Sequence, residues 1–285
     1  MPASAVISLS EARACKAPLA GLQRARGIGR VVFKPAGIRT VLDRLHEDGA
    51  ARIRLPRTHA AETCEAVLIN TAGGLTGGDR MSWDVTAGKD CQAVITTQAC
   101  EKVYRTAGGT AEVATRVEVA EGARLDWLPQ ETILFDGAEL SRTITADLAA
   151  DARLLVVEAV IFGRHAMGER VNTGVFRDCW RIHRAGKLVH AEEMRLEGAI
   201  SDTLARPAVL AGHATMASVV YFGEDAEAHL ERARAAIGEA GGASAFAGKL
   251  VARMTAADGM ALRRALVPLI ATLRGAAALP RAWMI

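Results

Sequence analysis

Two acidic side chains, Glu131 and Glu158, stand in strand-like segments whose alternation directs them toward the protein interior. Strand alternation places large apolar residues on the same face: Trp127, Ile133 and Phe135 with Glu131, and Val156, Val160 and Phe162 with Glu158. Burial of an unpaired carboxylate is costly, so each must be neutralised, hydrogen-bonded, paired with a basic side chain or open to internal water. The first interpretation is structural, with each carboxylate holding turn amides or an arginine such as Arg142 or Arg164. The second is a polar path, in which spaced oxygen ligands pass a divalent cation without retaining it.

His190 and Glu192 pose the same question in the predicted strand 188–196, because they share the parity of Leu188, Met194 and Leu196. A lone histidine on an apolar face is more often a hydrogen-bonded structural residue than a metal ligand. The structural interpretation is therefore favoured here, and a role in metal transit stays open because an acidic neighbour lies on the same face.

Residues 70–79, directly after the apolar segment 66–69, contain four glycines and end at Asp79. This run lacks both the GK[ST] ending of a phosphate-binding loop and the GxGxxG spacing of a dinucleotide loop. It predicts instead a tight, close-packed corner of backbone that presents Asp79. GxSxG, HExxH, His-x-His and CxxC patterns are also absent from the sequence, so an enzyme has little support and a β-rich hydrolase is the distant alternative.

Side-chain alternation with a period of two dominates residues 52–198, which predicts strands as the main element. Residues 113–119 alternate apolar and polar, whereas 154–162 are almost wholly apolar and predict a strand buried on both faces. Turn signals at 107–109, 121–122, 136–137 and 185–187 separate such runs.

Helical spacing appears only in the last third of the chain. Asp225 is expected to cap a helix near 225–240 that carries Ala226, Leu230, Ala233 and Ile237 and ends at Gly241-Gly242. A second helix is expected at 258–274, with Pro268 kinking or breaking it. The fold class is therefore mainly β, as a β-helix-like or layered-sheet body with a small C-terminal helical portion.

A faint repeat runs through the β region at a spacing of about 30 residues. Segments starting at Glu101, Glu131 and Glu158 share a carboxylate, one variable residue, a β-branched residue and a turn. If the repeat is real, one supersecondary unit stacks on itself and equivalent carboxylates form a column. Chance similarity is the alternative.

Composition narrows the class of protein. The 285 residues are 50% hydrophobic, enough for a sizeable core, and 35 basic against 32 acidic side chains are spread without long runs. The spread of charge indicates no basic arm for nucleic acid, and the aromatic content of only 4% indicates no platform for base stacking. Five cysteines without a CxxC pair, and no long uncharged apolar stretch, predict a cytoplasmic protein that is neither secreted nor membrane-spanning.

Several stretches together resemble the urease accessory proteins called UreD, or UreH in some bacteria. They are NTAGGLTGGD at 70–79, VITTQA at 94–99 with KVYR at 102–105, WLPQE at 127–131 with ILF at 133–135, GR at 163–164 with AMGE at 166–169, and LPR at 279–281 with Trp283. Two features depart from the pattern: Cys100-Glu101 replaces the commoner small or hydroxyl residues, and the Trp283-Met284-Ile285 tail lacks a polar or cysteine ending.

This resemblance implies a single β-rich domain over residues 24–285 after an unassigned segment 1–23. It implies a non-enzymatic maturation factor that binds apo-urease, recruits UreF and through it UreG, and helps deliver nickel to the urease active site. Nickel would be cargo in transit, with no tightly bound cofactor. The expected path consists of Asp79, Glu131, Asp136, Glu158, His190 and Glu192, because weak oxygen and imidazole ligands release a cation readily. A pure scaffold without metal transit is the competing hypothesis.

Overall fold

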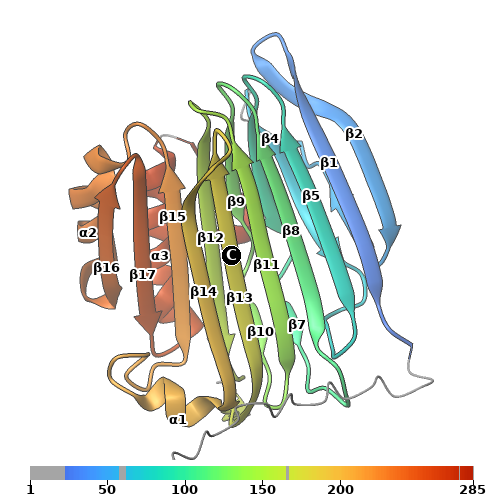
Figure 1. Ribbon diagram of the computed structural model, residues 1–285, viewed down its shortest axis with the longest axis vertical. Helices are drawn as coiled ribbons and strands as arrows, with labels where there is room; N and C mark the ends of the chain where they lie inside the picture. Colours follow the sequence, from blue (N-terminus) through green and yellow to red (C-terminus); the bar gives the residue numbers. More distant parts are fainter. Residues whose placement is uncertain (1–22, 58–61, 165–166, 276, 285) are drawn as a thin grey trace, which may run out of the picture.

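Two β-sheets stacked face to face form the body of the protein in a computed structural model that describes residues 23–57, 62–164, 167–275 and 277–284 (Figure 1). The seven-stranded sheet has the order β14-β13-β11-β8-β5-β1-β2. Its strands are β1 (Arg26–Ala36), β2 (Arg39–Gly49), β5 (Arg80–Ala87), β8 (Ala111–Val119), β11 (Glu139–Leu148), β13 (Thr173–Arg184) and β14 (Lys187–Ala199).

The ten-stranded sheet has the order β16-β17-β15-β12-β9-β6-β4-β3, with the short strands β7 and β10 attached through β12. These strands are β3 (Ala51–Arg54), β4 (Cys64–Asn70), β6 (Gln92–Thr97), β7 (Glu101–Val103), β9 (Arg124–Leu128), β10 (Thr132–Leu134), β12 (Arg153–Phe162), β15 (Thr215–Phe222), β16 (Gly241–Phe246) and β17 (Lys249–Ala256). The mainly-β prediction is confirmed.

The chain passes back and forth between the sheets from β4 to β13, and neighbouring strands within each sheet are parallel along this stretch. Each passage therefore adds one layer to a solenoid-like stack, which is the repeat that the sequence suggests. Antiparallel pairs close the stack at both ends, through β1–β2 and β3–β4 at one end and through β13–β14 and β12–β15–β17–β16 at the other.

The register of the stack overturns the predicted column of carboxylates. Glu101 in β7 pairs with Thr132 in β10, and Thr132 pairs with Val160 in β12. Glu131 is thus one residue, and Glu158 two residues, out of step with Glu101. The reason is that the paired positions 101, 132 and 160 are 31 and 28 residues apart, whereas the motif starts 101, 131 and 158 are 30 and 27 apart, so each step shifts the motif by one residue.

Two cores lie on the two faces of the ten-stranded sheet. One fills the space between the sheets, and the other lies between the ten-stranded sheet and helices α2 (Leu230–Ile237) and α3 (Gly259–Arg274). Because β12 is covered on both faces, nearly all its residues are buried, as 154–162 predict. β8 instead alternates buried and exposed positions over most of its length, in agreement with the pattern at 113–119.

The helix α3 matches the segment predicted at 258–274. The Asp258 carboxylate accepts a hydrogen bond from the Ala261 amide at 2.8 Å and caps the first turn. Of the two outcomes expected at Pro268, a kink or a break, the break is wrong, because the helix continues through it to Arg274. Pro268 lies on the exposed side of the helix, where water can satisfy the carbonyl that loses its donor.

The first predicted helix is shorter than expected. A 3₁₀ turn (Glu227–His229) leads into α2, which ends at Gly238 with φ of 55°. Another 3₁₀ turn (Gly238–Ala240) follows, and Gly241-Gly242 open the strand β16 instead of ending a helix. Asp225 does not cap the helix, because its carboxylate accepts the Tyr221 hydroxyl at 2.7 Å. The fold also contains two short helical elements that the sequence did not predict, α1 (Ile200–Ala205) and a 3₁₀ turn at Arg281–Trp283.

Candidate functional site

The glycine run forms the tight corner that its composition predicts. Gly73, Gly74 and Gly78 have positive φ, and a side chain at Gly77 would lie only 1.9 Å from the Thr106 hydroxyl. Asp79 is buried beneath this corner, where it accepts the amides of Ala25 and Thr76, both at 2.8 Å. Both Asp79 oxygens therefore stabilise the loop, and its place in a nickel path stays a prediction.

Asp136 occupies a similar position at the end of another layer. One oxygen accepts the amides of Asn172 and Thr173 at 2.8 and 3.0 Å, and the other accepts Arg105 Nη2 at 2.7 Å. This carboxylate ties the turn after β10 to the start of β13, which gives it a structural role independent of any metal.

Glu131 is buried on the helix face of the ten-stranded sheet, with 1% of its surface exposed. Arg263 of α3 donates to its two oxygens at 2.6 and 2.8 Å, and the Cys100 thiol donates to it at 3.4 Å. Burial acts to raise the pKa of Glu131, but the hydrogen bonds and charge of Arg263 outweigh burial, so that the pKa lies below its usual value. Burial also raises the pKa of Cys100 to about 11, which keeps it a thiol and a donor.

Glu158 lies on the opposite face of the same sheet, between the two sheets. It accepts Trp127 Nε1 at 2.9 Å and forms a short ion pair with Arg142. Arg142 also binds Asp178 through two hydrogen bonds of 3.1 and 2.5 Å. Burial is the main cause that raises the pKa of Glu158, with Arg142 opposing it and Asp178 adding to it. Arg142, one of the two arginines that the structural interpretation names, is thus the partner of Glu158, and the place of Glu158 in a cation path stays a prediction.

His190 and Glu192 of β14 extend this group of charges, and Glu192 is buried while His190 is largely so. Glu192 accepts the Ser218 hydroxyl at 2.8 Å and lies 3.1 Å from Arg253 Nη2, and Ser218 is the cross-strand partner of Glu158. His190 Nε2 lies 3.6 Å from the Glu192 carboxylate, too far for a hydrogen bond. Burial acts to raise the pKa of Glu192. The contacts with His190, Ser218 and Arg253 outweigh burial, so the pKa of Glu192 lies below its usual value.

Glu101 was not among the residues predicted for the path, yet it lines a small internal cavity of about 60 Å³ with Thr132, Arg142 and Glu158. Its carboxylate accepts Asn70 Nδ2 at 3.2 Å, and within the described part of the chain it has no ion pair. Burial raises the pKa of Glu101 to about 7, against the Asn70 hydrogen bond and with help from Asp79. Its presence in the faint repeat was the only sequence signal that could have identified it.

The side chains between the sheets form one connected group, which we call the polar layer: Glu101, Thr132, Arg142, Glu158, Asp178, Ser218, Glu192 and His190. It runs from the internal cavity at the glycine corner to the outer strand β14. Of the six predicted path residues, Glu158, Glu192 and His190 belong to it, whereas Asp79, Asp136 and Glu131 lie outside it. Among the described residues, the polar layer contains no group of three His, Cys, Asp or Glu side chains arranged to hold a metal ion.

The charges of the polar layer do not balance. Arg142 is the cation at its centre, and Asp178, Glu158 and Glu101 are three carboxylates near it. This excess of negative charge favours the binding of a proton or a cation inside the polar layer. Because the layer has no preformed coordination sphere among the described residues, a cation would bind weakly there.

None of the helices in the described part of the chain is long and apolar enough to cross a membrane.

Comparison with known proteins gives one consistent result. The sequence profile of the UreD urease accessory proteins matches residues 25–284. The urease accessory protein UreD of Rhizobium leguminosarum bv. viciae is 54% identical over 262 residues, which cover 92% of this chain and 96% of that protein. UreD of Agrobacterium fabrum is 53% identical over 92% of both chains, and UreD of Sinorhizobium medicae is 52% identical over 96% of this chain and 99% of its own. This chain therefore belongs to the UreD family of urease accessory proteins.

Proposed function

We propose that this protein acts without catalysis of its own, binds apo-urease together with UreF and UreG, and passes nickel toward the urease active site through the polar layer. Family membership supports the role in urease maturation. The observation that carries the transit step is the buried excess of carboxylates along the polar layer, since buried negative charge attracts a divalent cation.

The donor chemistry supports release over storage. Carboxylates, hydroxyls and one imidazole are weaker nickel ligands than a set of thiolates, and Cys100 lies on the other face of the ten-stranded sheet. A nickel ion moving along the layer would exchange single contacts with Glu101, Glu158 and Glu192 in turn. Protonation of Glu101, whose pKa is about 7, would weaken its hold on the ion.

One observation favours the alternative of a pure scaffold. Arg142 lies in the middle of the layer and is bonded to both Glu158 and Asp178, so a passing cation must overcome its charge or displace it. A scaffold would use the polar layer only to join the two sheets.

The test compares two matched variants, Glu158→Gln in the polar layer and Glu131→Gln on the helix face, each co-expressed with urease and its other accessory proteins. Loss of one carboxylate charge within about 10 Å of the ion raises the barrier to its passage by about 1–2 kcal/mol, or roughly five- to thirtyfold in rate. We expect Glu158→Gln to lower the nickel content of purified urease by metal analysis, and Glu131→Gln to lower it less.

Assembly of the accessory complex, followed by gel filtration, must be normal for both variants. If soluble Glu158→Gln assembles and yields fully loaded urease, the path is wrong and the scaffold stands. If urease reaches the same nickel content without this gene, the maturation role itself is wrong.

A further inference from the structure

The two sheets end at different places on one side of the molecule. β14 is the outermost strand of the seven-stranded sheet and lies over β15, as the Ser218–Glu192 hydrogen bond shows. The ten-stranded sheet continues past it by two more strands, β17 and β16 (Figure 1). Helices cover the other face of these two strands, but no strand of the described chain covers the face that continues the space between the sheets.

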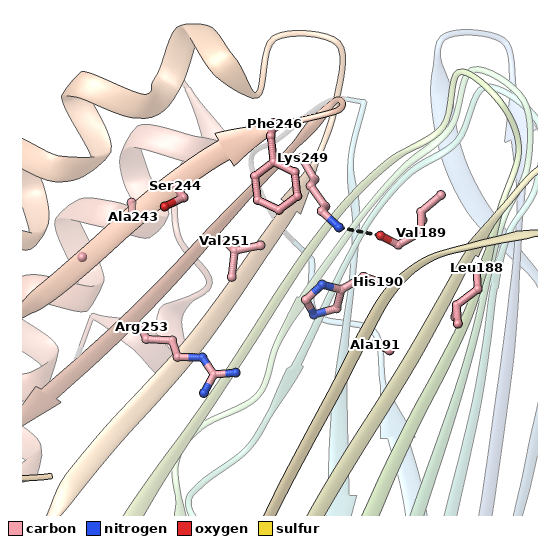
Figure 2. A pocket seen from close by; sticks show the side chains of 11 residues that line it. Leu188, Val189, His190, Ala191, Ala243, Ser244, Phe246, Lys249, Val251 and Arg253 are labelled. Carbon is pink, nitrogen blue, oxygen red and sulfur yellow. Dashed lines mark hydrogen bonds between the residues drawn. The ribbon is translucent and has the colours of Figure 1, made fainter. Parts of the chain in front are cut away.

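This step forms a groove of about 720 Å³. One wall is the outer edge of β14 with Leu188, and the other is the face of β16 and β17 with Phe246 and Val251 (Figure 2). Leu188 and Phe246 are 54% and 52% exposed, so the groove presents two large apolar side chains to solvent. The space corresponds to the position of one further strand beside β14.

Positive charge is concentrated in the same groove. Lys249 donates to the Val189 carbonyl at 2.5 Å and lies over the Phe246 ring at 4.7 Å. An ammonium group has three donors, and Lys249 has no carboxylate partner within the described part of the chain. Arg253 lies farther along the same strand and forms an ion pair with Glu192 of the polar layer at 3.1 Å.

The backbone around the groove is suited to an added strand. The edge of β14 has a strand neighbour on one side only, and a bulge at residue 189 breaks its register with β13. β16 contributes Gly242, where an added Cβ would meet no atom within 4 Å, and carries no charged residue. Although β14 itself carries charged side chains and the bulge, its open edge beside the uncharged face of β16 leaves room for an extended peptide to join the sheet.

We propose that this groove binds an extended segment of a partner protein, which pairs with the edge of β14, places an acidic side chain on Lys249 and packs an apolar side chain between Leu188 and Phe246. The partner is a component of the urease maturation complex, so this inference rests on the proposed function. Lys249, which has no carboxylate partner among the described residues, gives the acidic preference, and the groove beside the open edge of β14 gives the extended conformation.

Zero-length carbodiimide coupling of the assembled complex tests the charge contact directly, because it joins a lysine amine only to a carboxylate in contact with it. We expect mass spectrometry to find Lys249 joined to an Asp or Glu of a partner subunit. Lys187, an exposed lysine on β14 that does not line the groove, is the internal control and should not be joined. Lys249→Arg should abolish coupling and retain binding, since a guanidinium keeps the charge but does not react.

Affinity for each purified partner provides the second measurement. Lys249→Glu should weaken one partner at least about tenfold. Arg116→Glu makes the same charge change at an exposed position of β8 and should have no effect. Thermal melting of each variant separates loss of binding from loss of fold.

Unchanged binding of folded Lys249→Glu to every partner would overturn the proposal while leaving the maturation role intact. Coupling of Lys249 to a second copy of this chain, in a dimer that Lys249→Glu dissociates, would overturn it in favour of self-association. If the wild-type chain binds none of the maturation proteins, the proposed function and this inference both fail.

Discussion

The two faces of the ten-stranded sheet both bury carboxylates, but they balance them differently. On the helix face, Arg263 donates to both oxygens of Glu131, and Asp126 accepts Arg274 at 2.8 Å and Arg124 at 3.0 Å. Between the sheets, Glu158 and Asp178 share Arg142, and within the described part of the chain the partner of Glu101 is the Asn70 amide.

This difference separates anchoring from a site that can respond to a cation. A carboxylate whose two oxygens both accept from an arginine stays ionised, fixes α3 to the sheet and has little capacity left for another ligand. A carboxylate that shares its arginine, or has none, changes its protonation more readily and gains from a positive ion nearby. The polar layer is therefore the part of the molecule whose chemistry can change during function.

Replacing the central arginines gives the largest expected contrast. Arg142→Met leaves Glu158 and Asp178 buried without a cation and should reduce the free energy of unfolding by about 3–5 kcal/mol. Arg263→Met removes the arginine of Glu131 and leaves the Cys100 thiol as a donor, and the Arg263 guanidinium is less deeply buried than that of Arg142, so the expected cost is about 1–3 kcal/mol. Urea denaturation followed by circular dichroism measures both. Equal costs would show that sharing one arginine between two carboxylates has no energetic consequence.

Glu101 in the polar layer and Glu131 on the helix face should make stability depend on pH with opposite signs. The pKa of Glu101 is raised to about 7, so its contribution to stability is complete below its unfolded value near 4.5 and is lost as the pH rises through 7. The pKa of Glu131 is lowered, so its contribution is present above the unfolded value and is lost as the pH falls through the folded one.

Glu101→Gln should therefore stabilise the protein at pH 8, by about 1–3 kcal/mol, and have little effect at pH 4. Glu131→Gln should destabilise it at pH 8 and less so in acid. Denaturation midpoints measured from pH 4 to 8 test both variants against wild type. A destabilised Glu101→Gln at pH 8 would mean that Glu101 has a cationic partner in solution.

The smallest effect is expected at Cys100, which contacts Glu131 on the helix face. Cys100→Ser keeps a donor to Glu131 and should change stability by less than about 1 kcal/mol. It should also leave the nickel content of urease unchanged, because Cys100 lies outside the polar layer. A large loss of nickel in this variant, measured as for Glu158→Gln, would move the path to the helix face.

Much of the architecture could be predicted from local pattern. Alternation over 113–119 and the apolar run at 154–162 identified β8 and β12, and Asp258 with the apolar spacing behind it identified α3. Parity also predicted the burial of Glu131 and Glu158. The predicted shared face of Glu131 and Trp127 is wrong, because residues 129–131 lie between β9 and β10 and strand alternation does not continue through them. These features depend on residues a few positions apart, which is the range over which side-chain direction follows from secondary structure.

Only the tertiary structure decided which interior each carboxylate enters and what balances it there. Parity distinguishes two faces of a strand but does not say which faces the other sheet, because the ten-stranded sheet is covered on both. The partners are distant in sequence: Arg263 is 132 residues from Glu131, and Asp178 is 36 from Arg142. Each layer is one residue longer than the spacing of the motif starts, so the motif starts do not coincide in the sheet. The sequence determined that charge would be buried, and long-range packing decided where it is neutralised and where an excess remains.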